Sequence, residues 1–276
     1  MNRTLNSSHS GKRLVAISLG AGVQSSTLAL MSAHGEFGEL PDFAVFADTQ
    51  QEPKEVYRWL DWLEGKLPFP VRRVTRGDLA VDAVRLRVSK TGTTYTKAVV
   101  PAFIVDPSGA VGLAMRQCTS YHKIEVIHRE YSALRRKGPV EQWIGISLDE
   151  SHRMKPAREG WLTNRWPLVE RRMSRRDCLS WMDRMGYPEP PRSACVFCPY
   201  HSDHEWSRLK TNDPEAFDRA VSFEKEYQHA LGQVSGMRGK PFLHRSLVPL
   251  SEVVFGGDDG QMNLNFGNEC EGMCGV

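Results

Sequence analysis

Residues 13–26, RLVAISLGAGVQSS, hold the pattern that decides the fold. Residues 13–19 are a short run of β-branched and apolar side chains ended by glycine, which is typical of a buried strand. The loop Gly20-Ala21-Gly22 follows, and residues 25–33 are expected to form a helix. Small residues between a strand and a helix let backbone N–H groups approach a phosphate closely. The stretch therefore predicts a phosphate loop, with a plain tight turn as the alternative.

The pattern of strand and helix repeats beyond this loop. Residues 43–47 (FAVFA) predict a second buried strand, closed by Asp48-Thr49. After Pro53, four apolar residues recur at i, i+3, i+4 and i+7, which predicts one helical face: Val56, Trp59, Leu60 and Leu63. Further predicted elements are a strand at 71–75, a loop-rich stretch at 91–112, a long helix at 115–136, a strand at 142–147 and a charged helix at 214–231.

Strands that alternate with helices indicate an α/β fold, an open parallel sheet with helices on both faces in the Rossmann-like manner. We expect residues 1–12 to be a flexible tail and residues 13–185 to form a nucleotide-binding domain. Residues 186–276, where proline and glycine become frequent, are expected to form a small, irregular C-terminal lobe that carries cysteines.

The composition is that of an ordinary globular chain. Its 276 residues are 40% hydrophobic and 25% charged, and no apolar run reaches the roughly 18 residues of a membrane span. The polar start shows no signal-peptide core, so we expect a cytoplasmic protein without membrane contact. The net charge of +3 is mild, but arginines cluster at 72–76, 135–137 and 171–176. Such clusters attract phosphates or nucleic acid, or are solvated faces.

Six cysteines point to metal or redox chemistry, because a secreted disulfide framework would be smaller and follow a signal peptide. Cys195 and Cys198 form a CxxC followed by proline, a spacing that holds a metal or two corners of a cluster. Cys118 near the predicted long helix and Cys274 in the tail complete the expected ligand set. Cys178 lies in an apolar helical pattern and is expected to be a buried, inert thiol. His201 and His204 follow the CxxC, and a solvated or capping role is favoured over metal binding.

The loop resembles the PP-loop of ATP pyrophosphatases, a superfamily that includes phosphoadenylyl-sulfate reductases, tRNA thiolation enzymes and DNA phosphorothioation enzymes. Its usual pattern is Ser-Gly-Gly-x-Asp-Ser, from which this chain departs at Leu19, Ala21 and Gln24. The resemblance implies that ATP with Mg²⁺ is held by Ser18, Gly20, Gly22, Gln24, Ser25 and Ser26.

Two later segments share this resemblance. Asp48-Thr49 is similar to the segment that borders the adenosine in phosphoadenylyl-sulfate reductases. Residues 145–153 (GISLDESHR) resemble the glycine, acidic and arginine segment of the same enzymes. By this resemblance Gly145 approaches the nucleotide and Arg153 faces phosphate.

The resemblance also implies a four-iron iron–sulfur cluster on the cysteines, and structural zinc remains the alternative. The tail, with Glu269-Cys270, is similar to the Glu-Cys-Gly-x-His end of phosphoadenylyl-sulfate reductases, which implies Cys270 as a catalytic nucleophile. No histidine follows it here, and Glu271 stands in place of the glycine.

The expected function is an ATP-dependent sulfur transfer that forms AMP and pyrophosphate. Its acceptor would be a nucleotide or a nucleic acid, either tRNA or DNA, and a sulfur donor or electron donor protein would assist it. Two alternatives stay open: a sulfonucleotide reductase that consumes no ATP, and a zinc-stapled nucleotide-binding component of a larger assembly. A homodimer is left open.

Overall fold

Five parallel strands form the centre of the computed structural model, which describes residues 11–255. The strand order is β3-β2-β1-β8-β9, and every neighbouring pair in this sheet is parallel. The strands are β1 (Leu14–Leu19), β2 (Phe43–Asp48), β3 (Val71–Thr75), β8 (Val140–Ile144) and β9 (Leu162–Arg165). The expected α/β fold with a parallel sheet is therefore confirmed.

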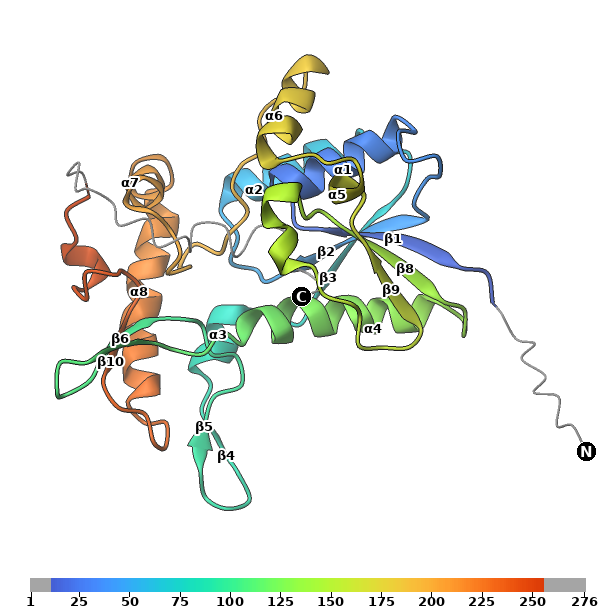
Figure 1. Cartoon of the computed structure of the whole chain (residues 1–276). Helices are drawn as coiled ribbons and strands as arrows, with labels where there is room; N and C mark the ends of the chain where they lie inside the picture. Colours follow the sequence, from blue (N-terminus) through green and yellow to red (C-terminus); the bar gives the residue numbers. More distant parts are fainter. Residues whose placement is uncertain (1–10, 256–276) are drawn as a thin grey trace, which may run out of the picture.

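Helices cover both faces of the sheet (Figure 1). One face carries α1 (Val23–Ala33), α2 (Lys54–Glu64), α5 (Pro167–Glu170) and α6 (Arg175–Arg184), and the other carries α4 (Glu125–Leu134). The alternation of side chains along a strand explains this arrangement. In β1, Val15 and Ile17 pack in the cluster of α1 and α2, whereas Ala16 packs with Ile127 and Tyr131 of α4.

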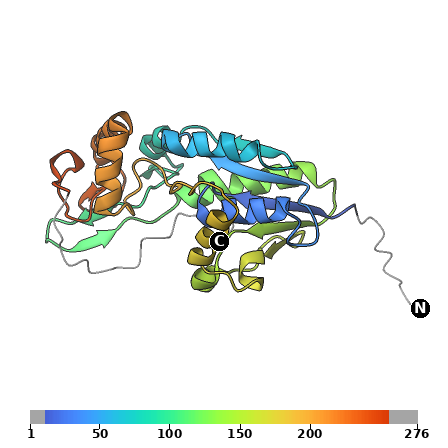
Figure 2. The same cartoon turned by 90° about the horizontal axis from the view of Figure 1, so that it is seen from above.

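A second hydrophobic cluster lies beside the sheet, around α8 (Pro214–Leu231) (Figure 2). It includes Leu79 and Val100 as well as Phe197 and Phe223, so it draws on both sides of the expected boundary at residue 185. α3 (Leu79–Val84), β6 (Phe103–Val105), α7 (Asp203–Asn212) and η3 (Leu250–Glu252) also contribute residues to it. The remaining elements outside the central sheet and its helices are β4 (Arg87–Val88), β5 (Thr94–Tyr95), β7 (Val111–Leu113) and β10 (Lys240–Phe242). The strands β10, β6 and β7 pair antiparallel, so the stretch predicted to be loop-rich contains short strands.

The helix predicted at 115–136 begins later than expected. A π-helical turn, η1 (Ser120–Ile124), precedes α4, and residues 115–117 are not helical. The N–H groups of Gln117 and Cys118 both donate to the carbonyl oxygen of Val99, at 2.9 and 3.2 Å. This contact with a distant segment replaces the hydrogen bonds of a first helical turn. Among residues 11–255, no helix combines the length and the apolar character needed to cross a bilayer.

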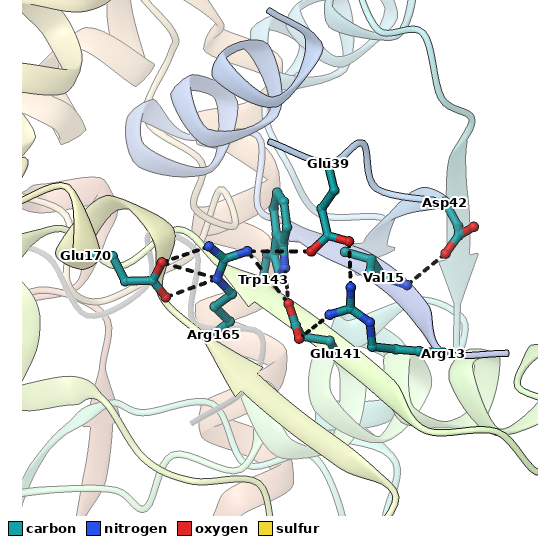
Figure 3. Close-up of polar contacts among 8 residues, drawn as sticks. All are labelled: Arg13, Val15, Glu39, Asp42, Glu141, Trp143, Arg165 and Glu170. Atoms are coloured by element: carbon teal, nitrogen blue, oxygen red, sulfur yellow. Dashed lines mark hydrogen bonds and ion pairs between the residues drawn. The ribbon is translucent and has the colours of Figure 1, made fainter. Parts of the chain in front are cut away.

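An ion-pair network ties three strands together on the face of the sheet that carries α1 (Figure 3). Arg13, just before β1, lies 2.5 Å from both Glu39 and Glu141, and Glu141 belongs to β8. Arg165 at the end of β9 lies 3.8 Å from the same two carboxylates. Because these groups are partly exposed, each pair is worth only about 0–1 kcal/mol. The network therefore adds little to the stability of the fold. Its main effect is to hold the ends of β1, β8 and β9 beside one another.

Candidate nucleotide and cysteine site

The order of the strands makes β1 the point where the chain changes direction across the sheet. β2 and β3 lie on one side of β1, and β8 and β9 lie on the other. In open α/β sheets, ligands bind outside the carboxyl ends of the strands at such a switch point. Ser18 lies near the carboxyl end of β1, and Gly145 directly follows β8. Two of the predicted nucleotide-binding segments therefore meet at this position.

The loop after β1 is held in shape by the hydroxyl group of Ser25. This oxygen accepts a hydrogen bond from the Gly20 N–H at 3.1 Å and donates one to the Gly22 carbonyl at 3.3 Å. Ala21 has a φ of 59°, in the left-handed region, which is uncommon for a residue with a Cβ atom. Gly22 is the N-cap of α1, and no side chain caps this helix. An anion is favoured at a helix N-terminus built in this way.

Gln24 and Ser26 are buried and connect the loop to neighbouring helices. The Ser26 hydroxyl accepts a hydrogen bond of 2.9 Å from the indole N–H of Trp59 on α2. The Gln24 amide donates to the Ser147 hydroxyl at 3.4 Å and accepts from the Arg175 guanidinium at 3.0 Å. Both side chains therefore set the position of α1 against α2, α6 and the segment after β8. Sequence reasoning did not identify Trp59 or Arg175 as contributors.

Gly145 lies against the backbone of the phosphate loop. A Cβ atom at this position would stand 2.7 Å from Cα and 2.8 Å from N of Ser25. No real side chain fits at that distance, so the contact requires glycine. The structure thus places Gly145 next to the N-terminus of α1, where the resemblance expects the nucleotide to be approached.

Asp48 ends β2 and is engaged by two donors. Its Oδ1 atom accepts a hydrogen bond from the Gln50 N–H at 2.7 Å and from the Tyr57 hydroxyl at 2.8 Å. Burial, together with this carboxylate, raises the pKa of Tyr57 above its ordinary value. Tyr57 therefore stays a neutral donor to Asp48. Gln50 takes a φ of 62°, so the chain turns sharply directly after the strand.

Arg153 lies in the 3-10 helix η2 (Leu148–Arg153), which follows β8. Its guanidinium Nη1 atom is 2.8 Å from the Glu150 carboxylate, and both residues are buried. The expectation that Arg153 faces phosphate stays a prediction.

Three cysteines from distant parts of the chain line one narrow cavity of about 20 Å³. Cys118 comes from the segment before η1, and Cys195 and Cys198 come from the CxxC turn. Within that turn the Cys198 N–H donates to the Cys195 carbonyl at 2.9 Å. Cys118 and the CxxC, which the sequence groups only by residue type, are thus neighbours in space.

The CxxC turn is fastened to the segment that follows β2. The Val196 N–H donates to the Gln51 carbonyl at 2.7 Å, and the Thr49 hydroxyl lies 3.3 Å from the Cys195 sulfur. Thr49 and Gln51 directly follow Asp48, which borders the switch point. Residues 48–52 therefore lie at the switch point and at the cysteine cavity at once.

A buried cation lines the cysteine cavity. Lys123, in η1, is 8% exposed, and its ammonium lies 3.6 Å from the Glu52 carboxylate, which is 1% exposed. Positive charge near a thiol favours the thiolate, which is the form that binds metals and attacks electrophiles. Sequence reasoning missed Lys123. The available signal is its position four residues before Ile127 and eight before Tyr131, on the apolar face of the helix.

His201 supports the CxxC turn from the other side. Its Nε2 atom lies 3.0 Å from the Cys195 carbonyl, and its side chain is only 7% exposed. Burial and the nearby Arg192 lower the pKa of His201 to about 4, so the neutral ring donates to this carbonyl. The expectation was a solvated or capping role for both histidines; His201 is of the capping kind, because it bonds a backbone carbonyl of the turn, and His204 is exposed to solvent. Cys178 is fully buried, which confirms the expectation of a buried thiol.

Thiolates are the ligands that iron–sulfur clusters and structural zinc both use, so the donor chemistry of the three cysteines fits either group. Within residues 11–255, no three His, Cys, Asp or Glu side chains are already gathered as a metal site. Cys270, the predicted nucleophile, and Cys274, the predicted fourth ligand, lie outside the described residues. In comparisons with known proteins, neither a family model nor a curated protein sequence matches this chain.

Proposed function

We propose that the protein is an ATP-dependent enzyme that activates an acceptor with release of pyrophosphate and then transfers sulfur to it. The proposal rests on one observation. Residues 48–52 border the switch point at Asp48 and hold the cysteine cavity through Thr49 and Gln51. This shared segment supports the proposal, because a nucleotide bound at the switch point and the nearby thiols could then act in consecutive steps on one substrate.

The first step belongs to the loop after β1. Its N–H groups and the N-terminus of α1 would bind the phosphates of ATP, with Mg²⁺ offsetting their charge. An oxygen of the acceptor attacks the α-phosphorus, the bond to the β-phosphate bridge oxygen breaks, and pyrophosphate leaves. The acceptor then carries AMP on that oxygen.

The second step belongs to the cysteines. A sulfur nucleophile attacks the activated carbon of the acceptor, and AMP leaves with the original oxygen. Cys118, Cys195 and Cys198 would hold an iron–sulfur cluster, which when bound offers a site for the transferred sulfide. Lys123 lines the same cavity as these thiols, and its positive charge would stabilise negative charge on sulfur. His201 fixes the carbonyl of Cys195 and thereby the orientation of the turn.

Pyrophosphate release from ATP tests the first step. We expect Ser25→Ala to lower the rate at least tenfold, because the hydroxyl holds Gly20 and Gly22 in position. Ser32→Ala is the matched control, since it removes a buried hydroxyl from the far end of the same helix. A wild-type protein that releases no pyrophosphate from ATP but forms sulfite from a sulfonucleotide would replace this proposal with a reductase.

Anaerobic purification with iron, sulfide and zinc analysis tests the cysteines. We expect iron and sulfide in the wild type and their loss in Cys195→Ser. Cys178→Ser is the control, because that thiol is buried in α6, outside the cysteine cavity. A colourless protein with one equivalent of zinc would exclude the cluster and leave the thiols a structural role.

A further inference from the structure

A second and larger cavity adjoins the cysteine cavity. Its volume is about 730 Å³, and it lies between the start of α4 and the segment at residues 155–159, which follows η2. Thr119 lines both cavities. Small-molecule sites in proteins commonly have volumes of roughly 300–1,000 Å³, so this cavity has the size of a nucleotide-like ligand and opens beside the thiols.

Three cationic side chains line this cavity. Lys155 and Arg158 are exposed at its wall, and neither side chain makes an ion pair or a hydrogen bond within residues 11–255. Arg116 adds a third positive charge at the Thr119 wall, where its Nε atom donates to the Thr119 hydroxyl at 3.0 Å. These three guanidinium and ammonium groups come from two segments that only the fold brings together.

The acidic groups of the cavity are already engaged. Glu125 lies 2.6 Å from the guanidinium of Arg76, and Glu159 lies 3.0 Å from Nδ1 of His128. The lining thus carries three cationic side chains against two carboxylates, and one of these carboxylates, Glu125, is paired with Arg76 outside the lining. Lys155 and Arg158 differ in this respect from the arginine cluster at 72–76, where Arg73 forms ion pairs with two acidic side chains on the protein surface.

The wall shared by the two cavities has unusual backbone geometry. The turn η1 is π-helical, and it contributes Ser120 and Ile124 to the larger cavity and Lys123 to the cysteine cavity. Single π-helical turns are rare and occur frequently at functional sites. Here the wider turn presents side chains of one short segment to both cavities.

We propose that this cavity binds the acceptor, and that the acceptor carries phosphate. Its phosphates would contact Lys155 and Arg158, while its reacting group would reach the cysteines past Thr119. Guanidinium and ammonium groups are the usual partners of phosphate oxygens. The assignment deepens the proposed sulfur transfer and rests on it. A nucleoside phosphate and a nucleic-acid strand offer the same chemistry, and the test separates them.

The test measures fluorescence anisotropy of labelled single-stranded RNA and DNA 12-mers on the full-length protein. Each phosphate contact contributes about 0.7 to the salt dependence of single-strand binding. The double variant Lys155→Ala/Arg158→Ala should therefore bind a strand about 25-fold more weakly at about 0.1 M salt, with a salt slope shallower by about 1.4. The control Arg219→Ala/Lys225→Ala removes the same charge from the exposed face of α8 and should stay within about twofold of the wild type.

Calorimetry with cytidine and uridine 5′-monophosphate identifies the source of the phosphate. Binding of a monophosphate that depends on Lys155 and Arg158, without strand binding, assigns the cavity to a free nucleotide. Equal affinities of the double variant and the control for both probes would overturn the proposal. A parallel loss of ATP affinity in the double variant would also overturn it, because the cavity would then belong to the ATP site. Failure of pyrophosphate release alone refutes the proposed reaction and leaves this binding result standing.

Discussion

Replacing Gly145 by alanine tests the contact between the end of β8 and the phosphate loop. The added Cβ would stand 2.7 Å from Cα of Ser25, whereas ordinary contacts begin near 3.4 Å. The neighbour is backbone at the start of α1, so the strand end or the helix must move by several tenths of an ångström. Overpacking of this kind costs typically about 1–3 kcal/mol. For a chain of this size we expect a fall in Tm of roughly 2–10 °C.

The same displacement moves the N–H groups of the loop, so ATP affinity should fall at least tenfold, or about 1.4 kcal/mol. Differential scanning fluorimetry gives Tm, and isothermal titration calorimetry gives the affinity. Gly112→Ala is the matched control, since a Cβ atom there meets no atom within 4 Å. An unchanged Tm in Gly145→Ala would refute the close approach. A lowered Tm with wild-type ATP affinity would show that the nucleotide does not bind at this loop.

Three further predictions concern buried groups. Lys123→Met removes the ammonium that lies 3.6 Å from the buried carboxylate of Glu52 and should lower the free energy of unfolding, measured in urea, by about 3 kcal/mol. Additive effects of the two changes in a Lys123→Met/Glu52→Gln double variant would contradict this pairing. Burial raises the pKa of Cys178 to about 12, so iodoacetamide at about pH 8 should label it only after denaturation, as read by mass spectrometry. Burial lowers the pKa of His122 below 6.5. Just below that pH, His122 is therefore protonated in the unfolded chain but still neutral in the folded chain. Stability should therefore fall as the pH drops below 6.5, by up to about 1.4 kcal/mol per unit, and His122→Asn should remove this part of the slope.

Local patterns were enough to predict the sheet and its first helices. The four apolar residues spaced along α2, from Val56 to Leu63, are the same four that the structure buries. Helical faces and buried strands could be predicted because both follow from the periodicity of apolar side chains, which is visible in the sequence. The helical stretch that continues into α4 begins at Cys118, about one turn later than predicted, because the N–H groups of Gln117 and Cys118 donate to the carbonyl of Val99. No local sequence pattern predicts such a contact.

The site was predictable by residue type but not by arrangement. Cys118 and the CxxC were expected to act together, yet their shared cavity depends on Thr49, 146 residues from Cys195. The buried pair of Lys123 and Glu52 joins two segments 71 positions apart in the sequence. Taken singly, each of these residues would be predicted to be an ordinary charged residue on the surface. Long-range pairing of this kind is a property of the fold, so it stays hidden until the strands are in order.

The segment at residues 48–52 has a consequence for how the two halves of the site communicate. Its side chains and carbonyls are anchored on one side by Tyr57 and on the other by the CxxC turn. A ligand that shifts this segment on the nucleotide side changes the free energy of the cysteine side. Thermodynamic reciprocity then requires that whatever the cysteines hold alters ATP affinity by the same factor, which for coupled sites is commonly about 5- to 150-fold. Under the proposed function, nucleotide affinity would thus differ between the protein with loaded thiols and the protein with free thiols.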